Sequence, residues 1–131
     1  MKKQKYNYRD AICNLIDYAG STLRFTRTEL KTKFKNFPVC IMDYVENGVQ
    51  EEFLEVRFDK EQATLSCMFN KDSKCNISFL YFDDSDCLDD YTSYLSSEYK
   101  YNYPECRWIL PNCRLSLGKT ENDICMVFVS E

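Results

Sequence analysis

Histidine is missing from the 131-residue sequence, and its absence removes several classes of chemistry. Ser-His-Asp and Cys-His nucleophile systems, zinc sites that use histidine, and histidine pH switches are all excluded. A general base would have to be a carboxylate, a lysine or a tyrosine whose pKa the fold had shifted. No local pattern of this kind stands out, so we expect a non-enzymatic protein without a cofactor.

Long apolar runs are missing as well. No window approaches the ~18 uncharged apolar residues of a membrane span, and the uncharged run at residues 75–82 has the length of a strand. Lys2, Lys3 and Lys5 could open a secretory leader, but Arg9 and Asp10 interrupt the apolar stretch that should follow. We therefore expect a cytoplasmic protein that does not contact a membrane.

The eight cysteines form no CxxC pair, which is the usual local geometry of redox dithiols and zinc knuckles. Four disulfides would need an oxidising compartment, which nothing else in the sequence indicates. A Cys-only metal site would need thiolates gathered from distant positions. We expect eight reduced thiols, several of them packed in the core as small hydrophobic side chains.

The composition is sufficient for one folded domain. The chain has 44% apolar and 29% charged residues, as a globular protein does. A chain of this length buries roughly 65–70% of its unfolded surface. No linker, repeat or low-complexity stretch divides it, so the sequence predicts a single domain over residues 1–131.

Two helices are expected near the N-terminus. Apolar residues recur at helical spacing from Tyr8 to Ala19, and Gly20 can take the left-handed conformation that ends a helix. Thr26 and Glu29 have the spacing of a capping box. This spacing predicts a second helix that starts at Thr26 and closes before Pro38.

From Val39 the apolar period changes to two, which indicates strands. The Asn47-Gly48 pair is a strong hairpin signal, and three further alternating segments follow it before residue 83. Successive strands with short turns describe an antiparallel meander of four strands.

A third helix is expected where Leu88, Tyr91 and Leu95 recur at helical spacing. Two more strands follow, at residues 113–117 and 124–129, and the second is apolar on both faces, so we place it centrally in the sheet. The predicted fold class is α+β, with an antiparallel sheet of about five to six strands, a meander plus a C-terminal hairpin. Two N-terminal helices, and one helix inserted before the last two strands, should pack on one face of this sheet.

Charge is divided unevenly along the chain. Residues 1–37 hold nine basic and three acidic groups, whereas residues 38–131 hold eight basic and eighteen acidic groups. The division predicts a basic helical end and an acidic sheet. In the simplest interpretation both signs are solvated surface, because charge affects solubility and association more than fold.

Five aspartates lie within eight residues at the predicted junction between a strand and the third helix: Asp83, Asp84, Asp86, Asp89 and Asp90. Helix capping and the helix dipole explain part of this cluster. Its spacing lacks the glycine and glutamate of a calcium loop, so we assign no metal ligand, although a divalent cation is an alternative. An acidic contact surface is the other alternative, because such a surface can dock on a basic partner.

Six further acids lie around the first hairpin and would extend that surface if they shared its face: Glu46, Glu51, Glu52, Glu55, Asp59 and Glu61. Tyrosines gather near the end of the third helix, where Tyr101 and Tyr103 alternate and Tyr94 precedes them. Aromatic rings of this kind are favoured at interfaces, although core packing is the competing interpretation. We expect Tyr94, Tyr101 and Tyr103 to contribute to a partner interface.

The basic end offers a competing function. Five cations there could contact phosphates: Arg24, Arg27, Lys31, Lys33 and Lys35. A winged-helix module would continue with a recognition helix, but Val39, Ile41 and Val45 favour a strand instead. Nucleic-acid binding through residues 1–37 is therefore the alternative.

The sequence favours a small binding protein that docks on the basic surface of another protein through the acidic cluster and the tyrosines. Inhibitors or immunity-type proteins that neutralise a basic effector would fit this size and acidity. Accessory proteins of phages or mobile elements would fit it equally.

Overall fold

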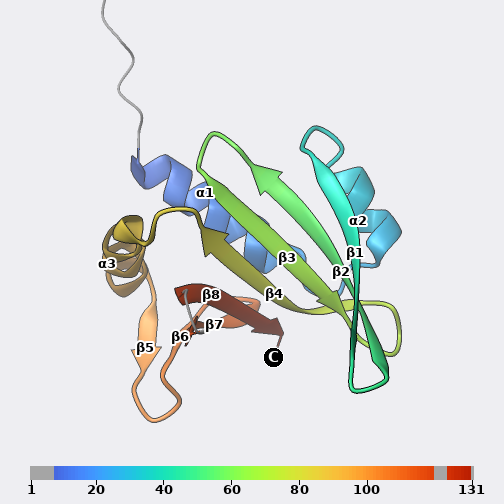
Figure 1. The fold of residues 1–131 in the computed structure, drawn as a ribbon. Coiled ribbons are helices and arrows are strands. Elements are labelled where there is room, and N and C mark those ends of the chain that lie inside the picture. The colour runs from blue at the N-terminus through green and yellow to red at the C-terminus, as the bar shows by residue number, and fades with distance from the viewer. Residues whose placement is uncertain (1–7, 120–123, 131) are drawn as a thin grey trace, which may run out of the picture.

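An eight-stranded antiparallel sheet forms the body of the computed structural model, which describes residues 8–119 and 124–130. The strand order is β1-β2-β3-β4-β8-β7-β6-β5 (Figure 1). The strands are β1 (Val39–Glu46), β2 (Val49–Phe58), β3 (Ala63–Phe69), β4 (Cys75–Phe82), β5 (Lys100–Asn102), β6 (Arg107–Ile109), β7 (Cys113–Lys119) and β8 (Ile124–Ser130).

The described helices share one core with the sheet. They are α1 (Tyr8–Ser21), α2 (Arg27–Lys33), the short 3-10 helix η1 (Ser85–Cys87) and α3 (Leu88–Glu98). Leu15 of α1, Leu30 of α2 and Leu95 of α3 are all buried in the same cluster as Leu80 of β4 and Phe128 of β8. Figure 1 shows α1 and α2 behind the sheet and α3 beside it, so the helices cover one face.

The topology uses one plan twice. Helices α1 and α2 lead into the meander β1–β4, and α3 leads into the meander β5–β8. The last strands of the two meanders pair antiparallel at the centre of the sheet, with Phe79 of β4 opposite Val127 of β8. The central position expected for the last strand is therefore confirmed.

Local signals account for several boundaries. The Thr26 hydroxyl accepts a hydrogen bond from the Glu29 amide (3.2 Å), and the Glu29 carboxylate accepts one from the Thr26 amide (3.1 Å), so the predicted capping box is present. Asn47 and Gly48 both have positive φ angles, 52° and 77°, as a type I′ hairpin turn requires.

The predicted number of strands was wrong, because the sheet has eight and not five to six. The two that were missed, β5 and β6, have three residues each, too few to show an alternating pattern. Consequently α3 precedes four strands and not two. Gly20 also differs from the expectation: it lies inside α1, and Arg24 is the residue that takes a positive φ angle, of 77°.

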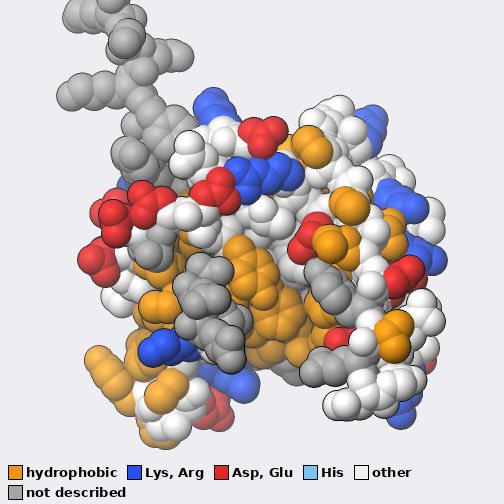
Figure 2. All heavy atoms as spheres, in the orientation of Figure 1, with side chains coloured by type: hydrophobic (Ala, Val, Ile, Leu, Met, Phe, Trp, Pro, Cys, Tyr) orange, Lys and Arg blue, Asp and Glu red, His pale blue; other side chains and the backbone are white. Residues whose placement is uncertain are grey.

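The second face of the sheet carries no helix among the described residues. Side chains that alternate with the core positions nevertheless make this face apolar: Phe53, Met68, Ile77, Phe79, Tyr81, Val127 and Val129, all half-buried. Figure 2, which has the orientation of Figure 1, shows an apolar area where β4 and β8 lie. We call this surface the open face.

Candidate functional site

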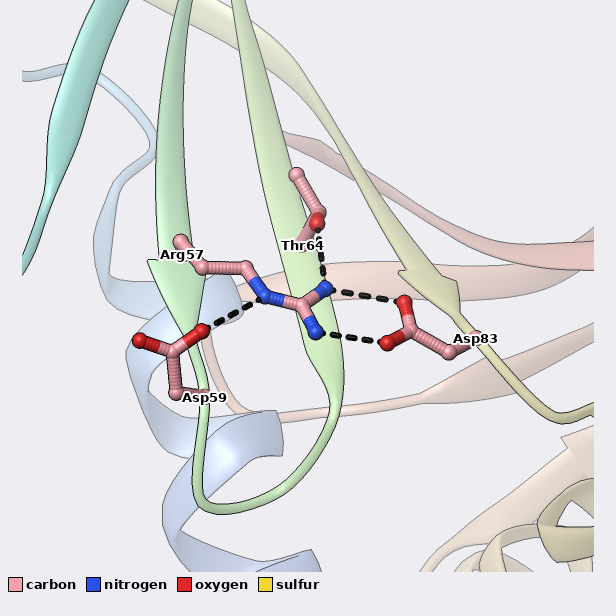
Figure 3. Close-up of polar contacts among 4 residues, drawn as sticks. All are labelled: Arg57, Asp59, Thr64 and Asp83. Carbon is pink, nitrogen blue, oxygen red and sulfur yellow. Dashed lines mark hydrogen bonds and ion pairs between the residues drawn. The ribbon is translucent and has the colours of Figure 1, made fainter.

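Arg57 holds the chain in place where β4 ends and the group of five aspartates, Asp83 to Asp90, begins. Its guanidinium donates to both carboxylate oxygens of Asp83, at 2.8 and 2.5 Å, to Asp59 at 3.1 Å and to the Thr64 hydroxyl at 3.1 Å (Figure 3). These hydrogen bonds lower the pKa of Asp83 and raise the pKa of Arg57 above its usual value. Asp83 is therefore a structural anion whose charge is already matched.

The chain turns into α3 directly after this clamp. The Asp84 side chain accepts a hydrogen bond from the Asp86 amide at 2.9 Å, and the Asp84 carbonyl lies 3.0 Å from the Cys87 thiol. These contacts close η1 and present Asp86, Asp89 and Asp90 at the surface, where all three are exposed. Negative charge in this first turn also complements the positive end of the α3 dipole.

The four aspartates after Asp83 form what we call the acidic junction: Asp84, Asp86, Asp89 and Asp90. Among the described residues, ion pairs join Arg9 to Glu98, Arg27 to Glu52, and Arg57 to Asp59 and Asp83, and none reaches the acidic junction. Figure 2 shows acidic side chains gathered on the side of the molecule where α3 begins. The junction is thus an exposed negative surface that no ion pair of the described residues neutralises.

Cys87 lies close enough to this negative charge for the pKa of its thiol to change. The pKa of its thiol is raised, first by burial and then by repulsion from Asp84, Asp90 and Asp86. A raised pKa keeps the thiol protonated, so it is a poor nucleophile at neutral pH.

A surface depression of about 380 Å³ adjoins the acidic junction. Asp84 and Glu61 contribute carboxylates to its wall, Tyr91 contributes an aromatic ring, and Lys60 contributes a cation. The ring of Tyr91 is anchored by Phe82, with the ring centroids 4.5 Å apart. The depression therefore combines acidic groups with a rigid aromatic surface.

The predicted tyrosines separate into two places. Tyr103 is 80% exposed at the β5–β6 hairpin, and its ring packs edge-on against Tyr101 at 5.0 Å. Tyr101 packs in turn against buried Trp108 at 4.8 Å. This hairpin follows the C-terminal end of α3, so its tyrosines lie about 16 Å or more from the acidic junction, the length of an eleven-residue helix.

Tyr94 makes its contacts within the fold. The Arg9 guanidinium lies 5.7 Å from the centre of its ring. A hydrogen bond with the Cys13 thiol, together with burial, raises the pKa of the Tyr94 hydroxyl. Tyr94 therefore joins α3 to α1, and Tyr103 is the tyrosine of the predicted set that is most available to a partner.

The acids of the first hairpin do not extend the acidic junction as one surface. Glu51 and Glu52 lie at the start of β2, whereas Asp59 follows its end, and a ten-residue strand spans about 30 Å. Glu52 is also paired with Arg27 of α2. Glu51 and Glu52 therefore lie at the opposite end of the sheet from the acidic junction, whereas Asp59 and Glu61 lie beside the junction.

The basic charge of the N-terminal part is concentrated around α2. Arg24, Lys31, Lys33 and Lys35 are exposed, and Lys33 lies 5.7 Å from the ring centre of Phe25. Helix α1 is not basic, because Arg9 is balanced by Asp10 and Asp17. Lys2, Lys3 and Lys5 lie outside the described residues.

The structure describes all eight cysteines and joins none of them in a disulfide, and four are buried: Cys67, Cys75, Cys113 and Cys125. Cys75 meets a small polar cluster in which the Thr22 and Ser78 hydroxyls lie 2.5 Å apart and Ser78 lies 3.3 Å from the Cys75 sulfur. A hydrogen bond from Cys67, with those of Ser78 and Thr22, lowers the pKa of Cys75 to about 7. The same contact and burial raise the pKa of Cys67, so the pair carries at most one negative charge.

Within residues 8–119 and 124–130, no three Cys, Asp or Glu side chains are placed to hold a metal ion. In the same ranges, no helix is long and apolar enough to cross a membrane.

The open face is the feature that the sequence interpretation did not use. Its signal was present, because residues 75–82 and 124–130 are apolar on both faces while all three predicted helices were placed on one face. Such a combination leaves one apolar face without a cover.

Comparison with protein-family models, with curated proteins and with solved structures finds no match for this chain.

Proposed function

We propose that this protein is a non-enzymatic binding protein whose acidic junction docks on a basic surface of another protein. One observation carries the proposal: four exposed carboxylates stand together at a rigid turn, and no ion pair of the described chain neutralises them. A positive partner surface would supply the missing charge and would be steered toward it from a distance.

The depression beside Asp84 gives the partner a place for one anchoring side chain. Its volume of about 380 Å³ accommodates a long arginine or lysine, with carboxylates for the charged group and the Tyr91 ring beside it. Tyr103, at the far end of α3, offers a second contact to a partner large enough to span the helix. An inhibitor that covers a basic effector would use a surface of this kind.

The acidic junction can be tested by charge reversal. The variant Asp84→Lys, Asp86→Lys, Asp89→Lys and Asp90→Lys leaves Asp83 and its clamp in place. Tagged wild-type and variant chains are purified side by side from the native cell, with stepwise salt elution and mass spectrometry. We expect a partner that wild type retains at low salt and releases as salt rises, and that the variant does not retain.

The matched control reverses four exposed acids that lie away from the junction: Asp43→Lys, Glu51→Lys, Asp72→Lys and Glu105→Lys. This control has the same change in net charge and should still retain the partner. Equal retention by wild type and both variants would contradict the proposal, and melting curves would establish that each variant is folded.

Nucleic-acid binding is the second candidate, and one observation favours it. Arg24, Lys31 and Lys35 around α2 are exposed and take no part in the ion pairs of the described residues. Phe25, 36% exposed beside Lys33, adds an aromatic ring that could stack on a base.

A mobility-shift titration with duplex DNA and with single-stranded RNA at two salt concentrations tests this candidate. If it is correct, wild type shifts the probe and the variant Lys31→Glu, Lys33→Glu and Lys35→Glu does not, whereas the acidic-junction variant still does. Absence of any shift at low salt would remove it.

A further inference from the structure

The open face is continuous across the sheet. Residues that are directly paired share a face, so the register places one row of side chains on it from β2 to β7: Glu55, Ser66, Phe79, Val127 and Ser116. A second row, one pair further along the strands, runs through Phe53, Met68, Ile77, Val129 and Arg114. The middle of both rows is apolar, with Glu55 at one end of the first row and Arg114 at one end of the second.

The two ends of the first row carry opposite charges. Glu55 lies on β2. Arg107 of β6 lies level with Ser116 of β7, because Trp108 pairs with Leu115 and Ile109 with Arg114. Neither Glu55 nor Arg107 takes part in the ion pairs of the described residues.

These two positions are related by the plan of the sheet. In the order β1-β2-β3-β4-β8-β7-β6-β5, β2 and β6 are each the third strand from the centre. A two-fold axis parallel to the strands, between β4 and β8, would lay β2 of one copy over β6 of another. Glu55 of each copy would then face Arg107 of the other.

We propose that two copies of this chain associate through their open faces. Phe79 and Val127 of the two copies meet at the centre, and two reciprocal Glu55–Arg107 ion pairs flank them. Figure 2 shows the apolar middle of one copy, with charged side chains of both signs toward β5 and β6 and toward β1 and β2. Sheets packed face to face in this way form the interior of a β-sandwich.

Two other charged side chains of the open face already have hydrogen-bond partners within the chain. Arg57 is matched by Asp83, and the Arg114 guanidinium donates to the carbonyls of Leu110 and Cys113, at 3.2 and 3.1 Å. Lys100 lies on the same face in β5, next to the strand of Arg107, and Glu51 lies on it in β2, the strand of Glu55. Both add to the charge complementarity of the two ends.

The area is sufficient for a stable dimer. Eight strands at about 4.8 Å spacing and about 20 Å in length present roughly 700 Å² per copy. Two copies would bury on the order of 1,400 Å², within the range of specific interfaces. The acidic junction lies beyond the end of β4, off this face, so the dimer does not depend on the proposed function and would present two junctions to partners.

The test measures the oligomeric state of the full chain by size-exclusion chromatography with light scattering, and the dissociation constant by sedimentation equilibrium. Wild type should be a dimer at micromolar concentration. Arg107→Glu and Glu55→Arg should each raise the dissociation constant at least about tenfold, and the double variant that swaps both charges should recover to within about threefold of wild type.

Lys35→Glu just after α2 and Asp72→Arg in the β3–β4 turn change charge away from the open face, and both should dimerise as wild type does. Arg107 is exposed, so its reversal leaves the fold intact, which circular dichroism checks. Phe79→Asp, at the centre, should produce a folded monomer.

A monomeric wild type at about 100 µM would overturn the proposal, since a specific dimer of this area is populated there. So would a dimer that no open-face variant weakens, or one that the charge swap does not restore. If the wild type is monomeric and a partner from the native cell binds the open face, the occupant is that partner and not a second copy.

Discussion

Arg57 holds Asp83 through both carboxylate oxygens, although 26 residues separate the two in the chain. The contact crosses β3, because Arg57 pairs with Thr64 and Thr64 pairs with Tyr81, two residues before Asp83. It therefore fixes the direction in which the chain leaves the sheet toward η1. The Asp83 amide also donates to the Gln62 carbonyl at 2.9 Å, so side chain and backbone together hold the start of the acidic junction.

Asp83→Asn should reduce stability at neutral pH and change its acid dependence. The hydrogen bonds from Arg57 lower the pKa of Asp83 below its usual value near 3.8. A carboxylate of this kind stabilises the fold above that value, and its contribution is lost as the pH falls through the lowered pKa. Urea midpoints of wild type and Asp83→Asn should therefore differ at pH 7 and should begin to converge only as the pH falls below about 4. Asp72→Asn, in an exposed turn, serves as the control and should match wild type throughout.

Thr26→Ala should destabilise the protein by about 1 kcal/mol, because it removes the hydroxyl that accepts a hydrogen bond from the Glu29 amide and caps α2. Urea unfolding measures the change. Thr28→Ala, two residues further on, removes a threonine hydroxyl from an exposed site and should reduce the free energy of unfolding by less. Equal losses in the two variants would show that the cap does not hold α2 in place.

Elements whose signals are local could be predicted from the sequence. The Thr26–Glu29 cap and the Asn47-Gly48 turn each depend on residues within one turn of chain, and both are present. The short strands β5 and β6 were missed because three residues form a strand only when a neighbour supplies the hydrogen bonds. Tyr101 and Tyr103 lie in and next to this hairpin, and their part in an interface stays a prediction.

Long-range pairing explains why the candidate sites were only partly predictable. The five aspartates could be recognised in the sequence. The ion pair that matches the charge of Asp83, however, depends on the register of β2, β3 and β4. The placement of Glu55 and Arg107 at the ends of one row depends on six strands. A single sequence contains no signal for such register.

Cysteine labelling should show whether the burial of a thiol or its pKa decides how fast it reacts. Cys40 and Cys106 are exposed, and iodoacetamide at pH 8 should label them first in the native protein. Cys75 should stay protected even though its pKa is lowered to about 7, because its side chain is buried and the reagent must reach the sulfur. Peptide mass spectrometry reads the order, and labelling in urea should reach all eight. Rapid native labelling of Cys75 would instead show that the contact between the α1–α2 connection and β4 opens readily.

Substitution by alanine should have opposite effects on stability at Gly118 and at Gly20. A Cβ at Gly118 would lie 2.8 Å from Val127 Cγ2 and 3.3 Å from the Cys125 sulfur, so Gly118→Ala must displace a side chain of the open face. We expect a loss of about 1–3 kcal/mol in the free energy of unfolding. A Cβ at Gly20, inside α1, would meet the Cys113 sulfur at 3.4 Å, an ordinary contact, so Gly20→Ala should be neutral or stabilising because alanine favours a helix. The double variant Gly118→Ala with Val127→Ala should cost less than the sum of its two single changes, since Val127→Ala removes the Cγ2 methyl that the new Cβ would meet. Additive losses would mean that Val127 moves aside without cost, and that the close approach of β7 to β8 has another cause.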